Sequence, residues 1–272
     1  MNLVAAVDEV ASETQLSEGG TCALLPVACV DAIDVAVKGC AVKVFHGRRF
    51  KKSHADDYQA LLKATREQME LATSRLLLFS LLDPSWKSAF VPFVRRAFSA
   101  SIAWAGITDP LAISIAHHLF PGLITLQRLT QDVCVESIEI EVDSDDVTKR
   151  LESSSVTTRG RTLQTAKLLT IAYNAHRKLI FPRSPELTDS GLRPLKDARS
   201  RAIQVADVFG NFALAYAFVQ LGDDSKTRVV KAQILADVFG DVLDPRCVVS
   251  VKRGTSTHGS AGELACTHAT ET

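Results

Sequence analysis

The chain has 272 residues, of which 46% are hydrophobic, and this is enough apolar side chain to bury a sizeable core. Lys plus Arg and Asp plus Glu both total 31, so the formal net charge is zero. This balance excludes a domain that binds polyanions through its overall charge, and a nucleic-acid site would have to use local basic clusters.

The sequence gives no sign of a membrane span or a secreted form. The N-terminal segment MNLVAAVDEV lacks a basic start and its apolar run is broken at Asp8, so no secretory signal is expected. The longest apolar region, 101–126, is interrupted by charged residues, His and Pro and is not expected to cross a bilayer. The six cysteines lie far apart without a CxxC pair, which favours reduced thiols, a cytoplasmic location and no zinc site.

The first third of the chain predicts strands followed by a helix. A short buried strand, Leu3 to Val10, is expected to pair as a hairpin with Ala23 to Val30, after a turn around Glu18-Gly19-Gly20. Residues 31–43 fit either a short helix or a strand. Asp56 to Ser74 predicts an amphipathic helix with Asp56 and Asp57 in its first turn. The apolar run Arg75 to Leu82 is typical of a central strand covered on both faces.

The remaining elements are predicted from periodicity and breaker residues. The clearest strand is Val133 to Val142, in which Ile138, Ile140 and Val142 alternate with Glu139, Glu141 and Asp143. The others, in chain order, are two or three helices in Trp86 to Leu129, a loop at Ser153 to Gly160, a helix at Arg161 to Ile180, a connection at Phe181 to Arg199, a helix from Ser200, a helix at Ser225 to Leu243, and a disordered tail at 252–272. We therefore expect one α/β domain over residues 1–245, with a mixed sheet flanked by helices and a helical insertion at about 84–130.

The segment SRAIQVADVFGNF, Ser200 to Phe212, places an ionisable side chain, Asp207, in an apolar helical run. Ser200, Gln204, Asp207 and Asn211 follow at spacings of four, three and four, which puts them on one stripe of the helix. A buried carboxylate without a partner is costly, so Asp207 is expected to be hydrogen-bonded, ion-paired, protonated or metal-bound.

The word ADVFG occurs twice, at Ala206 to Gly210 and at Ala236 to Gly240. The flanking sequences do not extend the match. In the second copy Asp237 shares a polar helix face with Lys226, Lys231, Gln233 and Asp241, so we interpret the repeat as a coincidence.

Acidic residues lie at three places that an α/β sheet would bring together. Asp8 and Glu9 end the first strand, Asp143 and Asp145 end the alternating strand, and Asp207 lies near the start of a late helix. Ligand groups in such sheets gather beyond strand ends. Clustered carboxylates imply bound cations or shared protons, and oxygen ligands suit Mg²⁺ or Mn²⁺.

Three motifs occur in an order that resembles the bacterial "domain of unknown function 3800" family, whose fold is similar to ribonuclease H. They are VAAVDEV, which ends in Asp8-Glu9, then VFHG with His46, and SRAIQVAD with Gln204 and Asp207. The resemblance runs from Asp8 to about Leu221. It implies Asp8, Glu9, Asp143 and Asp207 as acidic site residues, with His46 and Gln204 nearby. Glu141 and Asp145 compete with Asp143 for the middle position.

The resemblance implies a Mg²⁺- or Mn²⁺-dependent nuclease. In this hypothesis Asp8, Asp143 and Asp207 ligate metal, Glu9 ligates metal or positions water, and His46 assists proton transfer or phosphate binding. Basic residues beside the motifs would contact substrate phosphates, namely Arg48, Arg199 and Arg201 together with Gln204.

A second hypothesis is a non-catalytic interaction or regulatory protein whose site has decayed. The family follows Asp-Glu with Ser-Gly, whereas this chain has Val10-Ala11, and the net charge is zero. A hydrolase with a Ser or Cys nucleophile is disfavoured, because no GxSxG or Cys-His signature is present.

Overall fold

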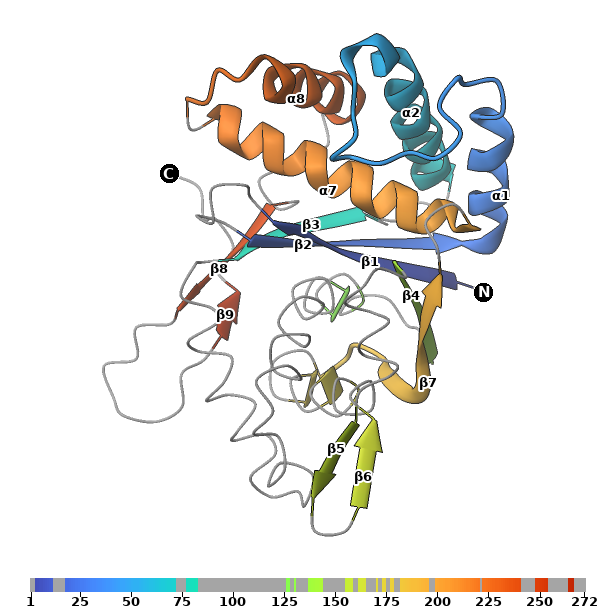
Figure 1. Cartoon of the computed structure of the whole chain (residues 1–272), viewed down its shortest axis with the longest axis vertical. Helices are drawn as coiled ribbons and strands as arrows, with labels where there is room; N and C mark the ends of the chain where they lie inside the picture. Colours follow the sequence, from blue (N-terminus) through green and yellow to red (C-terminus); the bar gives the residue numbers. More distant parts are fainter. Residues whose placement is uncertain are drawn as a thin grey trace.

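A mixed β-sheet with helices packed on one of its faces forms the framework of the protein in the computed structural model (Figure 1). The structure describes residues 3–11, 18–71, 77–82, 126–127, 130, 137–143, 155–158, 161–164, 170, 173–174, 177–178, 182–195, 199–220, 222–240, 248–253 and 264–266.

Within these residues the main sheet has seven strands in the order β7-β4-β1-β2-β3-β8-β9. Their bounds are β1 Leu3–Ala11, β2 Glu18–Pro26, β3 Leu77–Leu82, β4 Ser137–Asp143, β7 Glu186–Leu195, β8 Val248–Arg253 and β9 Leu264–Cys266. A separate antiparallel pair is formed by β5 Ser155–Thr158 and β6 Arg161–Gln164.

Strand β1 lies inside the sheet, antiparallel to β2 and parallel to β4. Ala5 and Ala6 are fully buried and Val7 is 1% exposed, so both faces of this strand are covered. On β4, Ile140 and Val142 are likewise buried, as the alternation of apolar and acidic residues predicts. The mixed pairing and the helical layer confirm the predicted α/β class, a mixed sheet flanked by helices.

Four described helices form the layer above the sheet in Figure 1. They are α1 Val27–Ala36, α2 Ala55–Leu71, α7 Arg201–Gln220 and α8 Lys226–Phe239, with a short 3₁₀ turn, η1 Lys52–His54, before α2. Asp56 and Asp57 in the first turn of α2 interact favourably with the positive end of its dipole. Beyond the end of α7, Gly222 takes φ 93°, and Asp223 N–H bonds to Phe218 O, as in a Schellman C-cap.

Helix α7 is the centre of the core, because it packs on β1 and β2 on one side and on the other helices on the other. Phe212 of this helix is fully buried against the rings of Phe50 and Tyr58, and Phe45 meets Tyr58 edge to face. Full burial of a side chain such as Phe212 stabilises the fold by about 1.5–3 kcal/mol. The loop that carries Phe45 and Phe50, residues 42–50, is therefore anchored to α7 by aromatic packing.

Helix α7 is long and apolar enough to cross a membrane by length and composition. However, 71% of its most apolar window is buried inside the protein. These properties are those of a core helix that is covered on most sides, which is how α7 lies in Figure 1.

Several predicted elements are confirmed. The structure contains the predicted strands Leu3 to Val10, Arg75 to Leu82 and Val133 to Val142, as β1, β3 and β4. It also contains the helices predicted to start at Asp56, Ser200 and Ser225, as α2, α7 and α8. The ends of these elements differ from the prediction by a few residues. These elements have strong apolar periodicity or a continuous apolar run, which makes their type predictable from local sequence.

Five predictions were wrong. The expected turn around Glu18-Gly19-Gly20 lies inside β2, and Val27 to Val30 begins α1 rather than ending the hairpin strand. Residues 155–158 are a strand rather than a loop, and 161–164 are its partner rather than the start of a helix. The expected connection at 181–199 contains β7. Among the described strands it lies at the edge of the sheet and pairs with β4 alone. An edge position tolerates Pro194 and needs no apolar alternation.

Two other predictions fall largely outside the described residues. Of the expected helical insertion at about 84–130, only 126, 127 and 130 are described, and these are helical. The segment expected as a tail, 252–272, contains the end of β8 and all of β9, which pair with each other.

Candidate functional site

Two of the sequence motifs meet in space, because the polar stripe of α7 binds the backbone of the 42–50 loop. Gln204 is 3% exposed, and its Oε1 accepts the Phe45 N–H at 3.0 Å. One residue pair further along, Oδ2 of Asp207 accepts the Gly47 N–H at 3.0 Å. We call this pair of contacts, Gln204 with Phe45 and Asp207 with Gly47, the loop clasp.

Asp207 is a satisfied carboxylate. Besides Gly47, its Oδ1 accepts a hydrogen bond from Nδ2 of Asn211 at 2.7 Å, and its Oδ2 lies 3.5 Å from Nδ1 of His46. The Asp207 side chain is 17% exposed and that of His46 is 21% exposed. The arrangement can hold the loop in place and can orient the imidazole of His46.

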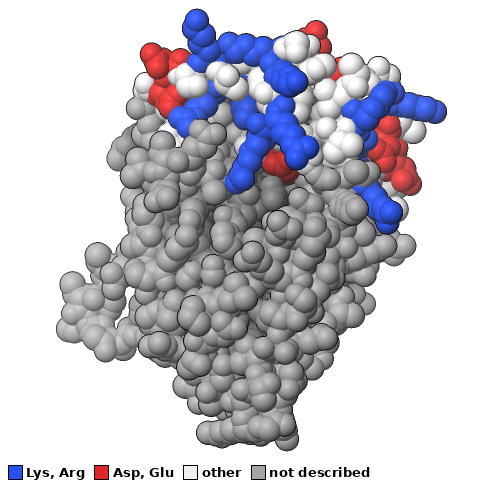
Figure 2. All heavy atoms as spheres, viewed as in Figure 1, with Lys and Arg blue, Asp and Glu red and all other residues white. Residues whose placement is uncertain are grey.

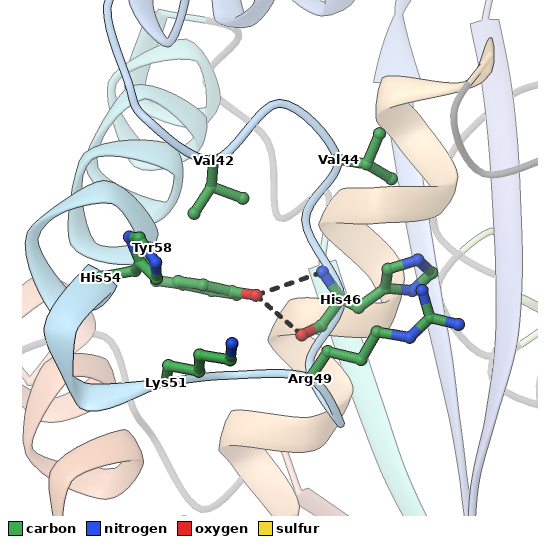
Figure 3. Close-up of a pocket in the computed structure, with 7 residues that line it drawn as sticks. All are labelled: Val42, Val44, His46, Arg49, Lys51, His54 and Tyr58. Atoms are coloured by element: carbon green, nitrogen blue, oxygen red, sulfur yellow. Dashed lines mark hydrogen bonds between the residues drawn. The ribbon is translucent and has the colours of Figure 1, made fainter.

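Tyr58 of α2 holds the backbone of His46 from the opposite side (Figure 3). Its hydroxyl donates to His46 O at 2.9 Å and accepts the His46 N–H at 3.3 Å. Burial raises the pKa of this phenol, and the negative charges of Asp207 and Asp57 act in the same direction. Tyr58 therefore stays protonated and keeps donating to His46.

The close approach of the loop to α7 explains why a glycine follows His46. A Cβ built on Gly47 would lie 2.4 Å from Cβ of Asn211 and 2.7 Å from its Nδ2. Any side chain at position 47 would push the loop away from the helix. The glycine of the His-Gly motif is therefore a packing requirement of the clasp.

Ser200 connects the start of α7 to the sheet. Its Oγ accepts the Ile203 N–H at 3.1 Å, which is an N-cap contact, and donates to Oε2 of Glu141 at 2.6 Å. Glu141 pairs in register with Ala6 of β1. Of the three candidates for the middle carboxylate, Glu141 is thus the one whose side chain the structure places, beside the first turn of α7.

The acidic residues of β1 and β4 are placed by strand pairing. The paired residues of the parallel β1–β4 pair end at Val7 with Val142, and Asp8 and Asp143 follow these residues directly on the two strands. Glu9 is the next residue of β1 and pairs with Gly20 of β2. The side chains of Asp8, Glu9 and Asp143 lie outside what the structure describes, as does Asp145.

The three predicted substrate-binding arginines lie in different surroundings. Arg201 pairs with Asp34 of α1 at 2.6 Å, bonds to Oε1 of Gln204 and lies over the ring of Phe45, with 12% of its side chain exposed. Arg48 and Arg199 are exposed. Figure 2 shows that Lys and Arg side chains extend over the described helical layer, next to smaller groups of Asp and Glu.

The acidic motifs imply a divalent cation, which would need several ligating side chains in one place. Among the side chains that the structure places, no three His, Cys, Asp or Glu residues are grouped so as to hold a metal ion. Both oxygens of Asp207 already accept hydrogen bonds. Asp8 and Asp143, which follow the paired residues Val7 and Val142 on adjacent strands, have carboxylate oxygens of the type that hard cations prefer.

Sequence reasoning did not single out His54 and Tyr58. Together with Arg49 and Lys51 of the basic segment, and with His46, Val42 and Val44, they line a pocket of about 400 Å³ (Figure 3). The basic character of the 48–52 segment was visible in the sequence. Its combination with a phenol and an imidazole from other turns was not, because α2 and the loop are brought together only by packing on α7.

Two cysteines whose side chains the structure describes, Cys29 and Cys40, are free thiols. Burial raises the pKa of both thiols, and Asp57 adds to the effect at Cys40. Both thiols are therefore less acidic than an ordinary cysteine.

No family model matches the chain, and no curated protein is similar to it. Among solved structures, the ribonuclease H2 from Pyrococcus horikoshii OT3 is similar with a TM-score of 0.40 and 14% identity, over 89% of this chain and 90% of that chain. At this TM-score the likeness carries no functional assignment. The resemblance to the "domain of unknown function 3800" family stays a prediction.

Proposed function

We propose that this chain is a divalent-metal-dependent hydrolase of phosphodiester bonds that acts on nucleic acid. The observation that carries the proposal is the parallel pairing of β1 and β4, after which Asp8 and Asp143 follow on the two strands. Neighbouring strands lie about 4.8 Å apart, so the two acidic residues occupy adjacent positions in the sheet.

In this proposal Asp8 and Asp143 hold Mg²⁺ or Mn²⁺, with Glu9 as a further oxygen donor. Such cations, when bound, activate water and stabilise the leaving oxygen of a phosphodiester. The exposed residues Arg48 and Arg199 contact backbone phosphates of the substrate. A direct bond from Asp207 to the metal stays a prediction.

His46 is the proposed proton carrier. Its backbone is held by Tyr58, and its Nδ1 faces the carboxylate of Asp207 at 3.5 Å. A carboxylate at that distance favours the tautomer with the proton on Nδ1, and the imidazole then exchanges a proton at Nε2. Asp207 and Tyr58 act as positioning residues for His46.

The test is cleavage of single- and double-stranded DNA, RNA and their hybrids by the purified protein in Mn²⁺ or Mg²⁺. Asp8→Asn and Asp143→Asn should each reduce cleavage by at least about a hundredfold, a loss comparable with that of a group that acts in the transition state. Asp237→Asn is the matched control, because Asp237 is an exposed Asp on α8. Cleavage that survives Asp8→Asn unchanged would refute the proposed site.

The second candidate, a non-catalytic interaction protein, is favoured by the contacts of Asp207. Its carboxylate is satisfied by Gly47 and Asn211 without any metal. Thermal unfolding separates the two candidates. A cation that binds only the native protein raises its stability by about RT ln(1 + [L]/Kd), so the hydrolase predicts a Mn²⁺-dependent rise in Tm that Asp8→Asn abolishes. An equal Tm with Mn²⁺ and with EDTA supports the interaction protein.

A further inference from the structure

The pocket beside the loop clasp has the composition of an oxyanion site. Four basic side chains line it, two of them permanently charged, namely Arg49 and Lys51, and two of them imidazoles, His46 and His54. None of its lining residues is acidic. In the described part of the chain neither Arg49 nor Lys51 is engaged in an ion pair, and both side chains are exposed. Their charges are available to a ligand.

Two carboxylates face the imidazoles of the pocket. Asp57 accepts the Val42 N–H at 2.9 Å and lies 3.7 Å from Nδ1 of His54, and Asp207 stands in the same relation to His46. Each carboxylate therefore faces one nitrogen of its imidazole and is held by a backbone N–H. The positive charges of Arg49 and Lys51 therefore determine the sign of the electrostatic potential at the pocket opening.

The other part of the lining is apolar. Val42 and Val44 form one side of the pocket, and the ring of Tyr58 adjoins them (Figure 3). The volume of about 400 Å³ lies within the range of about 300–1,000 Å³ that is typical of small-molecule sites, and exceeds what one phosphate needs. A ligand that fits both parts has an anionic head and a flat or apolar body.

We infer that this pocket binds a phosphate monoester attached to a ring system, that is, a nucleotide, either free or at the 5′ end of a strand. Arg49 and Lys51 hold the phosphate, Arg49 through paired N–H donors and Lys51 as a point charge. Tyr58, Val42 and Val44 contact the nucleoside. Binding needs neither a metal ion nor bond cleavage, so it goes beyond the proposed hydrolase and can be present without it.

The experiment measures binding by calorimetry in EDTA at about 50 mM and 200 mM salt. The probes are inorganic phosphate, adenosine, adenosine 5′-monophosphate, and a short oligonucleotide with either a 5′-phosphate or a 5′-hydroxyl. We expect the monophosphate to bind at least tenfold more tightly than adenosine or phosphate alone. Equal binding of the 5′-phosphorylated oligonucleotide assigns the pocket to strand ends, and weaker binding assigns it to free nucleotides.

The double variant Arg49→Gln/Lys51→Gln should lower the affinity for the monophosphate at least tenfold. Its matched control is Lys52→Gln/Arg183→Gln, which removes the same two charges at exposed positions outside the pocket lining and should change affinity less than about threefold. Both pairs are exposed, so the fold is expected to be kept, and circular dichroism checks this.

Three results would overturn the inference. The first is absence of binding to the wild-type protein at millimolar monophosphate, and the second is an equal loss of affinity in the two double variants. The third is a 5′-hydroxyl oligonucleotide that binds as tightly as the adenosine monophosphate, since the 5′-phosphate would then contribute nothing. The binding experiments contain no metal, so they remain valid if the protein proves to have no hydrolase activity. Conversely, absence of nucleotide binding says nothing about the proposed metal site at Asp8 and Asp143.

Discussion

Gln204→Met tests whether the loop clasp stabilises the fold. Methionine is close to glutamine in length and removes the acceptor without leaving a large cavity. Gln204 is 3% exposed and accepts the Phe45 N–H at 3.0 Å. Phe45 is fully buried, so in the variant its N–H has no water to replace the lost acceptor.

The expected cost follows from these contacts. A buried donor that loses its acceptor costs about 1–3 kcal/mol, and Arg201 loses one partner in addition. Arg201 keeps its ion pair with Asp34, so its share is small. We expect a loss of about 2–3 kcal/mol in the free energy of unfolding, which for a chain of this size lowers the Tm by roughly 4–12 °C.

Urea denaturation and thermal unfolding measure the loss, and Gln233→Met is the control. Gln233 lies on α8, is exposed, and donates to Oδ1 of Asp237 at 2.7 Å, so its replacement should cost less than about 0.5 kcal/mol. Hydrogen exchange of a peptide that contains Phe45 gives a local readout, and its protection should fall in Gln204→Met alone. Equal stability of the two variants, or unchanged exchange at Phe45, would refute the clasp.

Three further predictions concern the neighbours of Gln204. Asp207→Asn should lower the free energy of unfolding by about 1 kcal/mol, since an amide cannot accept hydrogen bonds from both Gly47 and Asn211 in the present geometry. The control is Asp237→Asn in the exposed copy of ADVFG, which should cost less than about 0.5 kcal/mol. Urea denaturation measures both variants, and equal losses of stability would contradict the argument. Gly47→Ala should lower the free energy of unfolding by about 1–3 kcal/mol, because the added Cβ would lie 2.4 Å from Cβ of Asn211. Adding Asn211→Ala keeps that second Cβ and should not restore stability. Adding Asn211→Gly removes it, and a double-mutant cycle should then show a smaller cost for Gly47→Ala. Burial raises the pKa of Tyr58 above the ordinary tyrosine value of about 10. Its stabilising contribution is therefore fully present below about pH 10 and is lost as the pH rises through the raised pKa. Above about pH 10 the Tm of the wild-type protein should fall more steeply than that of Tyr58→Phe, and parallel curves would count against this prediction.

The helix that carries Gln204 and Asp207 was predictable from local sequence. The stripe of Ser200, Gln204, Asp207 and Asn211 follows from helical spacing alone. The structure confirms that the stripe is polar and shows a role for each residue. Ser200 caps the helix and donates a hydrogen bond to Glu141, whereas Gln204 and Asp207 hold the 42–50 loop.

The partners of that stripe were not predictable from spacing. The contacts of Gln204 with Phe45 and of Asp207 with Gly47 join residues 159 and 160 positions apart. The sequence motifs only suggested that His46 and Gln204 lie near the same site. That the acceptors of α7 bind backbone N–H groups of the loop depends on how α2 and the loop pack on the helix.

Strands also differ in how far local sequence predicts them. The sequence did not predict β7 or the β5–β6 pair, because their residues carry no apolar alternation and these strands are held by backbone pairing with a neighbour. By contrast, β3 was predicted, since its run of leucines must be buried wherever the strand pairs.

The sequence by itself therefore determined the element types with strong periodicity, the polar stripe on an apolar helix and the order of the acidic strand residues, because each of these depends on neighbours a few positions apart. Only the tertiary structure decided that Asp207 is satisfied by the His46-Gly47 backbone and imidazole, that Glu141 meets Ser200, and that Arg49, Lys51 and Tyr58 share a pocket. The physical reason is that a hydrogen-bond acceptor or a charge acquires its partner only when packing of the apolar core brings distant segments within about 3 Å of each other.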